Sequence, residues 1–255
     1  IVALTFTMTV CGSLTAAAAS ELTAESKPAI QYTVDANQEV YALLDFEDTA
    51  EFENATKGQI ASPDTLDIYD ENGKLVWSQT AYAFLDQDAP DTANPSLWRD
   101  TQLNHIYGLF EVTDGIYQVR GYDMSNVTFI KGDTGWIVVD PLMSVECAQA
   151  AFALVEENLG TFPVKAVIYS HSHVDHFGGV KGIVAEEEVQ AGNVQKIAPE
   201  GFEKHAVSEN IYAGTAMGRR ASYQYGTMLE GGETGSLAIG IGMGQSKGST
   251  SYISP

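Results

Sequence analysis

The 255-residue sequence is poor in positive charge. Its 13 Lys and Arg residues face 34 Asp and Glu residues, which gives a formal net charge of -21 at pH 7. Such a surface repels polyanions, so we do not expect nucleic acid as a partner. A small anionic substrate stays compatible with this charge, because metal ions and nearby arginines set the potential at close range.

Cysteine is also scarce, with only Cys11 and Cys147 present. Residues 1–19 contain no charged side chain and run from an apolar stretch to Ala16-Ala17-Ala18-Ala19. This pattern is typical of a signal peptide, here without its usual start, so we predict an exported protein, periplasmic or secreted, with no stable membrane span after cleavage. A membrane-spanning helix is the alternative. Removal of Cys11 would leave Cys147 alone, which excludes an internal disulfide and favours a buried position on a helix.

The sequence predicts three parts along the chain. Residues 1–19 form the signal segment, residues 20–100 an N-terminal extension with strands of its own, and residues 101–255 a further domain. We expect the polar stretch 20–36 to be an extended arm. Asn72-Gly73 lies between two short alternating runs, which is a strong indication of a β-hairpin.

Beyond residue 100 the apolar residues follow strand and helix periods. Ser144 and Gly160 have the residue types that begin and end a helix, and the apolar positions between them keep helical spacing. A further helix, a strand near 194–198 and a helical stretch over 202–225 are expected next, and the glycine-rich tail 231–251 is interpreted as a flexible loop. The predicted class is α/β (α+β). Strands are predicted over 115–120, 126–130, 136–139 and 164–169.

Three of the five histidines lie in one string, His171-Ser172-His173-Val174-Asp175-His176, directly after the apolar run 164–169. Alternate side chains of an extended segment point the same way, so His171 and His173 can bind one metal ion. A turn then presents Asp175 and His176 to a second ion. Imidazole and carboxylate ligands suit zinc. The string therefore predicts a site for two zinc ions.

Hydrolysis is the reaction class that such a site implies, because zinc lowers the pKa of bound water to near neutrality and polarises the group under attack. A closed structural zinc site and a surface histidine cluster without metal are the alternatives. An active site is favoured because the strand and the string are followed by Phe177-Gly178-Gly179, which we expect to open a helix, as at the sites of α/β sheets. The two glycines would suit a backbone crowded against a ligand.

The string, with Asp140 at the end of an earlier strand, resembles the metallo-β-lactamase superfamily, whose fold is an αββα sandwich. Four further stretches are similar to the linear primary-alkylsulfatase family, namely 89–99, 108–121, 206–210 and 219–223. The resemblance implies an incomplete αββα sandwich, with residues 101–255 as the truncated first part of a metallo-β-lactamase-like catalytic domain. It also implies a hydrolase that uses two zinc ions to cleave alkyl sulfate esters such as dodecyl sulfate, an anionic amphiphile, and a full-length protein that forms a homodimer.

By this resemblance, His171 and His173 hold one zinc ion, while Asp175 and His176 hold the other and Asp175 orients the nucleophilic water. Family members supply two glutamates and another histidine further along, so the remaining ligands are expected beyond Pro255. His205 is interpreted as a surface or packing residue. We therefore expect these 255 residues alone to bind zinc weakly and to turn over no substrate.

Arg219 and Arg220 are candidates for substrate binding, because a guanidinium pairs well with sulfate oxygens. A solvated helix face is the alternative, and Asn210 is a third candidate. Two other functions stay open. The chain can be another hydrolase of the superfamily, a β-lactamase or a thioesterase, or a non-catalytic scaffold without metal; the intact ligand string argues against the scaffold.

Overall fold

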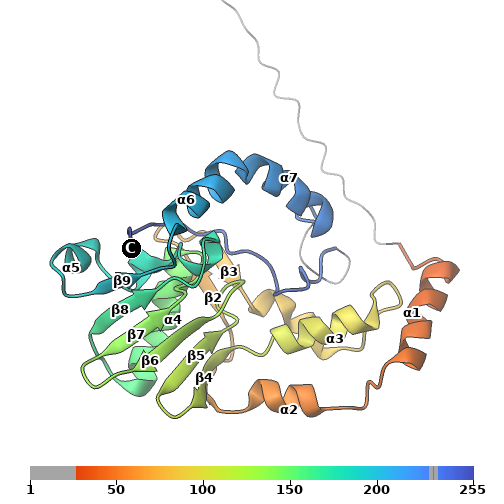
Figure 1. The fold of residues 1–255 in the computed structure, drawn as a ribbon. Coiled ribbons are helices and arrows are strands. Elements are labelled where there is room, and N and C mark those ends of the chain that lie inside the picture. The colour runs from red at the N-terminus through yellow and green to blue at the C-terminus, as the bar shows by residue number, and fades with distance from the viewer. Residues whose placement is uncertain (1–26, 230–231, 233–234) are drawn as a thin grey trace, which may run out of the picture.

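A computed structural model describes residues 27–229, 232 and 235–255, so the predicted signal segment lies outside the described residues. A seven-stranded sheet in the order β1-β4-β5-β6-β7-β8-β9 forms the centre (Figure 1). Its strands are β1 (Gln59–Ala61), β4 (Gly108–Thr113), β5 (Ile116–Arg120), β6 (Val127–Lys131), β7 (Trp136–Val139), β8 (Val164–Ile168) and β9 (Gln195–Ile197). Neighbouring strands are antiparallel from β1 to β7 and parallel from β7 to β9.

The remaining elements lie around this sheet. Strands β2 (Asp67–Tyr69) and β3 (Leu75–Ser78) form a separate two-stranded sheet, which confirms the hairpin predicted at Asn72-Gly73. The α-helices are α1 (Gln31–Leu43), α2 (Ala50–Thr56), α3 (Pro95–Asn104), α4 (Val145–Leu159), α5 (Glu186–Gln190), α6 (Phe202–Val207) and α7 (Gly214–Gln224). Short 3-10 turns are η1 (Thr80–Asp86), η2 (Val174–His176) and η3 (Val180–Gly182), and η4 (Ser208–Tyr212) is a π-helical turn.

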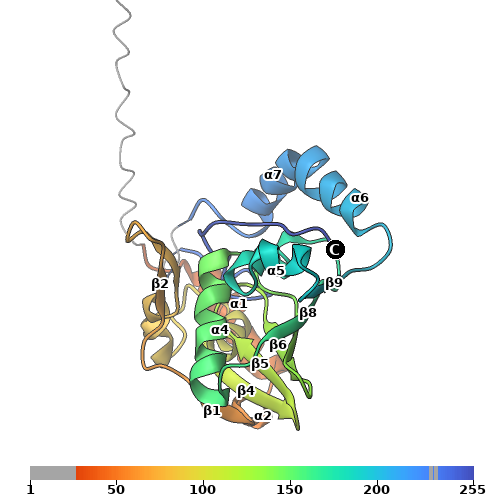
Figure 2. The ribbon, with the colours of Figure 1, turned by 90° about the vertical axis from the view of Figure 1, so that its left-hand side faces the viewer.

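Helix α4 lies against one face of the sheet (Figure 2) and connects β7 to β8. Ser144 caps it by accepting a hydrogen bond from the Cys147 backbone N–H, and Gly160, at φ +90°, ends it. Cys147 is fully buried, as predicted. Phe152 stacks on Phe129 of β6, with ring centroids 5.8 Å apart, so the helix and the sheet share one core. The predicted strand–helix–strand unit is confirmed.

Two predictions for local structure were wrong. The stretch 20–36 is not extended to its end, because α1 begins at Gln31. None of the side chains of α1 is buried, so this helix has no amphipathic sequence pattern that would reveal it. The segment after the histidine string does not open a helix at Phe177. The 3-10 turn η3 covers only Val180–Gly182, and α5 begins only at Glu186.

Gly178 and Gly179 lie close to the loop after β7. A Cβ on Gly178 would lie 2.3 Å from the Met143 carbonyl oxygen, and one on Gly179 would lie 2.2 Å from that of Pro141. The backbone is therefore crowded, and the atoms that crowd it belong to the protein's own loop after β7. This contact fixes the exit of the histidine string on the end of the neighbouring strand.

The glycine-rich tail forms no helix or strand after α7 among its described residues, in line with the predicted loop. It is nevertheless attached at several points. Ser246 donates its hydroxyl to the buried Asp123 carboxylate at 2.8 Å, and the Ser251 backbone N–H donates to the Gly178 carbonyl at 2.6 Å. The tail thus passes beside the residues that follow the histidine string.

The fold class is confirmed as mixed α/β, and the sandwich is incomplete as expected, since the described residues supply one large sheet, its helix α4 and a two-stranded hairpin. The predicted N-terminal extension contributes β1 to the large sheet, where Gln59 lies opposite Phe110 of β4. No helix in the described part of the chain combines the length and the apolar character needed to cross a membrane.

Replacing Gly179 by Ala should destabilise the fold. The added Cβ would meet the carbonyl oxygens of Pro141 at 2.2 Å and Ser144 at 2.6 Å, and overpacking of this kind costs about 1–3 kcal/mol. The matched control is Gly218→Ala on α7, where nothing lies within 4 Å of the new Cβ and helix propensity favours Ala by about 1 kcal/mol. Urea unfolding measures both, and equal stability of the two variants would contradict the crowding.

Candidate metal centre

Parallel pairing of β7 and β8 brings two polar segments to the same edge of the sheet. Val139 lies opposite Ile168 in the register, so Asp140 and the histidine string follow neighbouring strand ends. The Asp140 backbone N–H donates to the Ile168 carbonyl at 3.0 Å. In return, the Asp140 carboxylate accepts from the Ser170 backbone N–H at 2.7 Å and from its hydroxyl at 2.5 Å. Asp140 therefore holds the start of the histidine string.

The loop after β7 is strained in a way that fits a functional site. Asp140 and Leu142 have positive φ values of 56° and 59°, a conformation that Asp tolerates and Leu rarely adopts. Leu142 is fully buried, and its carbonyl accepts a hydrogen bond from Gly179 at 3.0 Å. Such strain, of about 1–3 kcal/mol per residue, persists only where surrounding contacts fix the backbone. Here they fix the Asp140 carboxylate beside the string.

His171 and His173 present two ring nitrogens to one point. Nε2 of His171 lies 3.1 Å from Nδ1 of His173, and both residues are exposed. Two ligands of one tetrahedral zinc ion, each at about 2.0–2.1 Å, stand roughly 3.3 Å apart. The observed separation fits that requirement. The structure therefore brings together the first predicted ligand pair.

Asp175 and His176 form the second predicted pair. Nε2 of His176 lies 3.0 Å from the Asp175 carboxylate, while Nδ1 lies 2.9 Å from the Asp140 carboxylate. A carboxylate on the outward ring nitrogen is the usual support of a metal-binding histidine. The ring centroids of His171 and His176 are 4.2 Å apart, so the two ligand pairs lie next to each other. Ligand atoms of Asp140, His171 and His176 also lie within 4.8 Å of one another. Three imidazoles and one carboxylate suit zinc.

The carboxylates and histidines of the site shift one another's pKa values. Burial by itself would lower the pKa of His176, but its hydrogen bonds to Asp140 and Asp175 outweigh burial and raise the pKa to about 9. Burial and the neighbouring His176 lower the pKa of His171, which keeps that ring neutral and able to bind metal. In the metal-free protein a proton on His176 thus occupies the position between two carboxylates.

The loop between β5 and β6 forms a hydrogen bond with the backbone of the string. The Ser125 hydroxyl donates to the backbone carbonyl of Asp175. Two residues earlier, the buried Asp123 carboxylate accepts from the backbone N–H groups of Met143 and Ser144, each at 3.2 Å, and from Ser246 of the tail. Burial raises the pKa of Asp123 against these hydrogen bonds. One loop thereby connects the ligand string, the loop after β7 and the tail.

Glu209 is a polar neighbour of the string that sequence reasoning missed. Its carboxylate accepts from the Ser172 hydroxyl at 3.0 Å and lies 3.6 Å from Nε2 of His173. The next residue, Asn210, was a candidate for substrate binding, and its side-chain amide donates to the Ser172 carbonyl at 3.4 Å. No spacing rule links a glutamate on a distant helical stretch to the string, so only the packing reveals it.

The other candidates lie outside these contacts. Arg219 and Arg220 are exposed on α7, and among the described residues no hydrogen bond or ion pair joins either one to the string. Their assignment to substrate stays a prediction. His205 is exposed on α6, in agreement with its interpretation as a surface residue.

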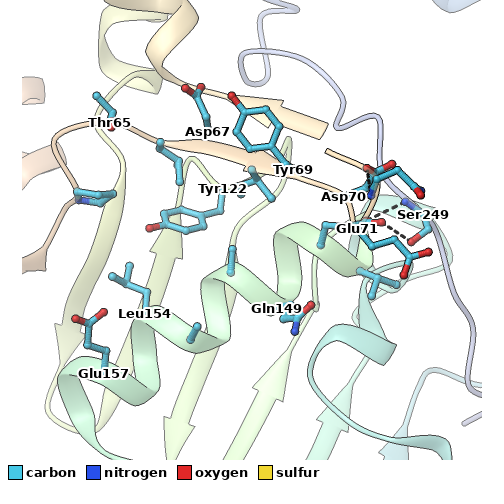
Figure 3. Close-up of a pocket in the computed structure, with 18 residues that line it drawn as sticks. Thr65, Asp67, Tyr69, Asp70, Glu71, Tyr122, Gln149, Leu154, Glu157 and Ser249 are labelled. Carbon is cyan, nitrogen blue, oxygen red and sulfur yellow. Dashed lines mark hydrogen bonds between the residues drawn. The ribbon is translucent and has the colours of Figure 1, made fainter. Parts of the chain in front are cut away.

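A hollow of about 1070 Å³ lies between the β2–β3 hairpin and α4 (Figure 3). None of the four predicted ligands lines it. Its walls carry several carboxylates, including Asp70, Glu71 and Glu157, which would repel an anionic substrate. We therefore do not count this hollow as part of the metal centre.

Asp140→Asn should lower the pKa of His176 in the zinc-free protein from about 9 toward the ordinary 6.5, because one of the two carboxylates is lost. A histidine whose pKa is raised by folding stabilises the fold below pH 6.5 and loses that effect as the pH rises through 9. The variant should therefore lose less stability over this interval. NMR titration of the imidazole measures the pKa directly, and a value near 6.5 in the unmutated protein would refute the arrangement.

Comparisons with known proteins agree with this geometry. Residues 120–249 match the model of the metallo-beta-lactamase superfamily. The chain is 50% identical to a linear primary-alkylsulfatase from Pseudomonas sp. over 90% of its own length and 34% of the relative's. It is also 50% identical to an (R)-specific secondary-alkylsulfatase from Pseudomonas sp., over 85% of this chain and 33% of that protein.

A solved structure extends the agreement to three dimensions. The stereoselective inverting sec-alkylsulfatase Pisa1 from Pseudomonas sp. superposes with a TM-score of 0.85 at 48% identity, covering 91% of this chain and 37% of that one. The chain thus spans about a third of the length of the curated relatives it matches. The chain belongs to the metallo-beta-lactamase superfamily, and over about a third of their length it is similar to proteins named as alkylsulfatases.

Proposed function

We propose that this protein hydrolyses alkyl sulfate esters of the dodecyl sulfate type, to alcohol and sulfate, at a centre of two zinc ions. The observation that carries the proposal is the convergence of two ligand pairs on the string, with nitrogens 3.1 Å apart in one pair and a nitrogen and a carboxylate oxygen 3.0 Å apart in the other. The relatives named as alkylsulfatases, at 50% identity, support the sulfate ester as the substrate class.

The residues of this chain would hold the ions and keep them accessible. His171 and His173 would hold one ion, and Asp175 and His176 the other. Bound zinc would supply water with a pKa near neutrality and a positive centre for the ester oxygens. With metal bound, Asp140 would accept a hydrogen bond from Nδ1–H of His176, so that Nε2 offers its lone pair to the metal. The exposed rings of His171 and His173 leave the centre open to a substrate.

Primary esters are the proposed class because residues 89–99 and 108–121 resemble the linear primary-alkylsulfatase family. Overall identity supports neither class over the other, since the relatives named for primary and for secondary esters are both 50% identical to this chain. A β-lactamase or thioesterase activity has no comparable support among these relatives.

Zinc-loaded protein in its full natural length should release sulfate from dodecyl sulfate and should not open a carbapenem. Removal of zinc by a chelator should abolish the activity, and zinc should restore it. Asp175→Ala should lower kcat/KM by more than about 100-fold, because losing a ligand costs more than losing its hydrogen-bond partner, which costs about 10–100-fold. Sulfate release is measured by ion chromatography. Full activity after exhaustive chelation would overturn the proposal, and octan-2-yl sulfate tests the secondary class in parallel.

The 255-residue polypeptide alone should bind zinc weakly and release no sulfate. The string supplies two ligands to each ion, whereas catalytic zinc sites in proteins have three protein ligands. Isothermal titration calorimetry of the zinc-free polypeptide measures the affinity. Tight binding of two equivalents would mean that ligands within this chain complete the centre.

A further inference from the structure

The stretch from α6 through η4 to α7 arches over the end of the sheet that carries the histidine string (Figure 1). Its middle, Ser208–Tyr212, is a π-helical turn, closed by a 2.9 Å hydrogen bond from the Ala213 backbone N–H to the Ser208 carbonyl. Such turns are rare and occur often at functional sites. Here two consecutive residues, Glu209 and Asn210, both reach Ser172 inside the string.

The two contacts place the Glu209 carboxylate beside Nε2 of His173. The Asn210 side-chain amide donates to the Ala206 carbonyl at 2.8 Å and also to the Ser172 carbonyl, so it attaches the turn to the Ser172 backbone. Glu209 accepts from the Ser172 hydroxyl at 3.0 Å, and the same carboxylate oxygen lies 3.6 Å from Nε2 of His173. Since Nδ1 of His173 faces His171, Nε2 is its outward nitrogen.

We propose that Glu209 is a positioning residue for His173. The Glu209 carboxylate accepts a hydrogen bond from Nε2–H of the ring and so turns Nδ1 toward the metal position shared with His171. The inference deepens the proposed function and rests on its metal centre. The same relation is present at full hydrogen-bond distance on the second pair, where Asp140 lies 2.9 Å from the outward nitrogen of His176.

The 3.6 Å separation at Glu209 is longer than a hydrogen bond, and the two side chains keep 43% and 61% of their surface exposed. Both can therefore rotate. With a metal ion held at Nδ1, the Nε2–H group of His173 would be a stronger donor and the Glu209 carboxylate would move closer to it. This movement costs little conformational entropy, because the Ser172 hydroxyl already orients the same oxygen of the Glu209 carboxylate.

The test measures zinc affinity of the full-length protein by competition with a chromophoric chelator. Glu209→Ala should weaken one of the two zinc ions by about 10–100-fold and leave the other within about threefold, as expected for loss of a carboxylate behind a histidine ligand. Glu209→Gln should recover part of this loss, because the amide oxygen still accepts the N–H. With cobalt in place of zinc, the visible absorption of the affected site should change in Glu209→Ala.

Two control variants separate positioning from support of the fold. Ser172→Ala removes the hydroxyl that orients the Glu209 carboxylate but leaves the carboxylate itself, which can still accept a hydrogen bond from Nε2–H of His173, so its effect on zinc affinity should be well below that of Glu209→Ala. Glu203→Ala, on α6, removes the hydrogen bonds from Tyr252 and Ser254 and should leave both affinities unchanged. Equal losses in Ser172→Ala and Glu209→Ala, or no loss in Glu209→Ala, would overturn the proposal.

The outcome for Glu209 can be told apart from that of the proposed function. Unmutated protein that binds two zinc ions but leaves dodecyl sulfate intact would refute the substrate class, and the affinities would still decide the role of Glu209. Unmutated protein that binds no zinc would overturn both. Urea unfolding of the zinc-free Glu209 variants, with unchanged midpoints, would show that a loss of affinity is not a loss of fold.

Discussion

Parallel pairing of β7 with β8 is the constraint on which the site depends. Because the two strands run the same way, their carboxyl ends meet, and the residues after each one share the same space. Asp140 follows one strand and the histidine string follows the other. An antiparallel neighbour would have placed Asp140 at the opposite edge. Helix α4 makes the parallel pairing possible, since such strands need a long crossover, and its buried face adds the core contacts that hold the strands in register.

The centre concentrates opposite charges in a chain of net charge -21. Three imidazoles gather where carboxylates converge, and in the absence of metal the proton on His176 partly neutralises Asp140 and Asp175. Metal and proton therefore compete for the same nitrogen. The strained loop at Asp140 and Leu142, the crowded glycines after the string and the buried Asp123 connect these groups to the surrounding fold. Carboxylates also stand behind the outward nitrogens of two of the three histidines.

Sequence patterns predicted the elements that depend on local chemistry. The hairpin at Asn72-Gly73, the helix between Ser144 and Gly160 and the strands around it follow from turn residues, caps and hydrophobic periods, and all are present. Helix α1 escaped prediction because it buries no side chain and so has no clear apolar face. The helix expected at Phe177 is absent. Gly178 and Gly179 pack closely against the loop after β7, a contact between distant residues that no local sequence pattern reveals.

By itself the sequence determined that three imidazoles and a carboxylate lie in one short string, and its spacing predicted that an extended segment and a turn sort them into two ligand pairs. Only the tertiary structure decided which carboxylate stands behind which ring. Asp140 reaches His176 across 36 positions of the chain, and Glu209 reaches Ser172 across 37. Hydrophobic period and turn chemistry act over a few residues, whereas such distant contacts arise only when strands pair and helices pack over them.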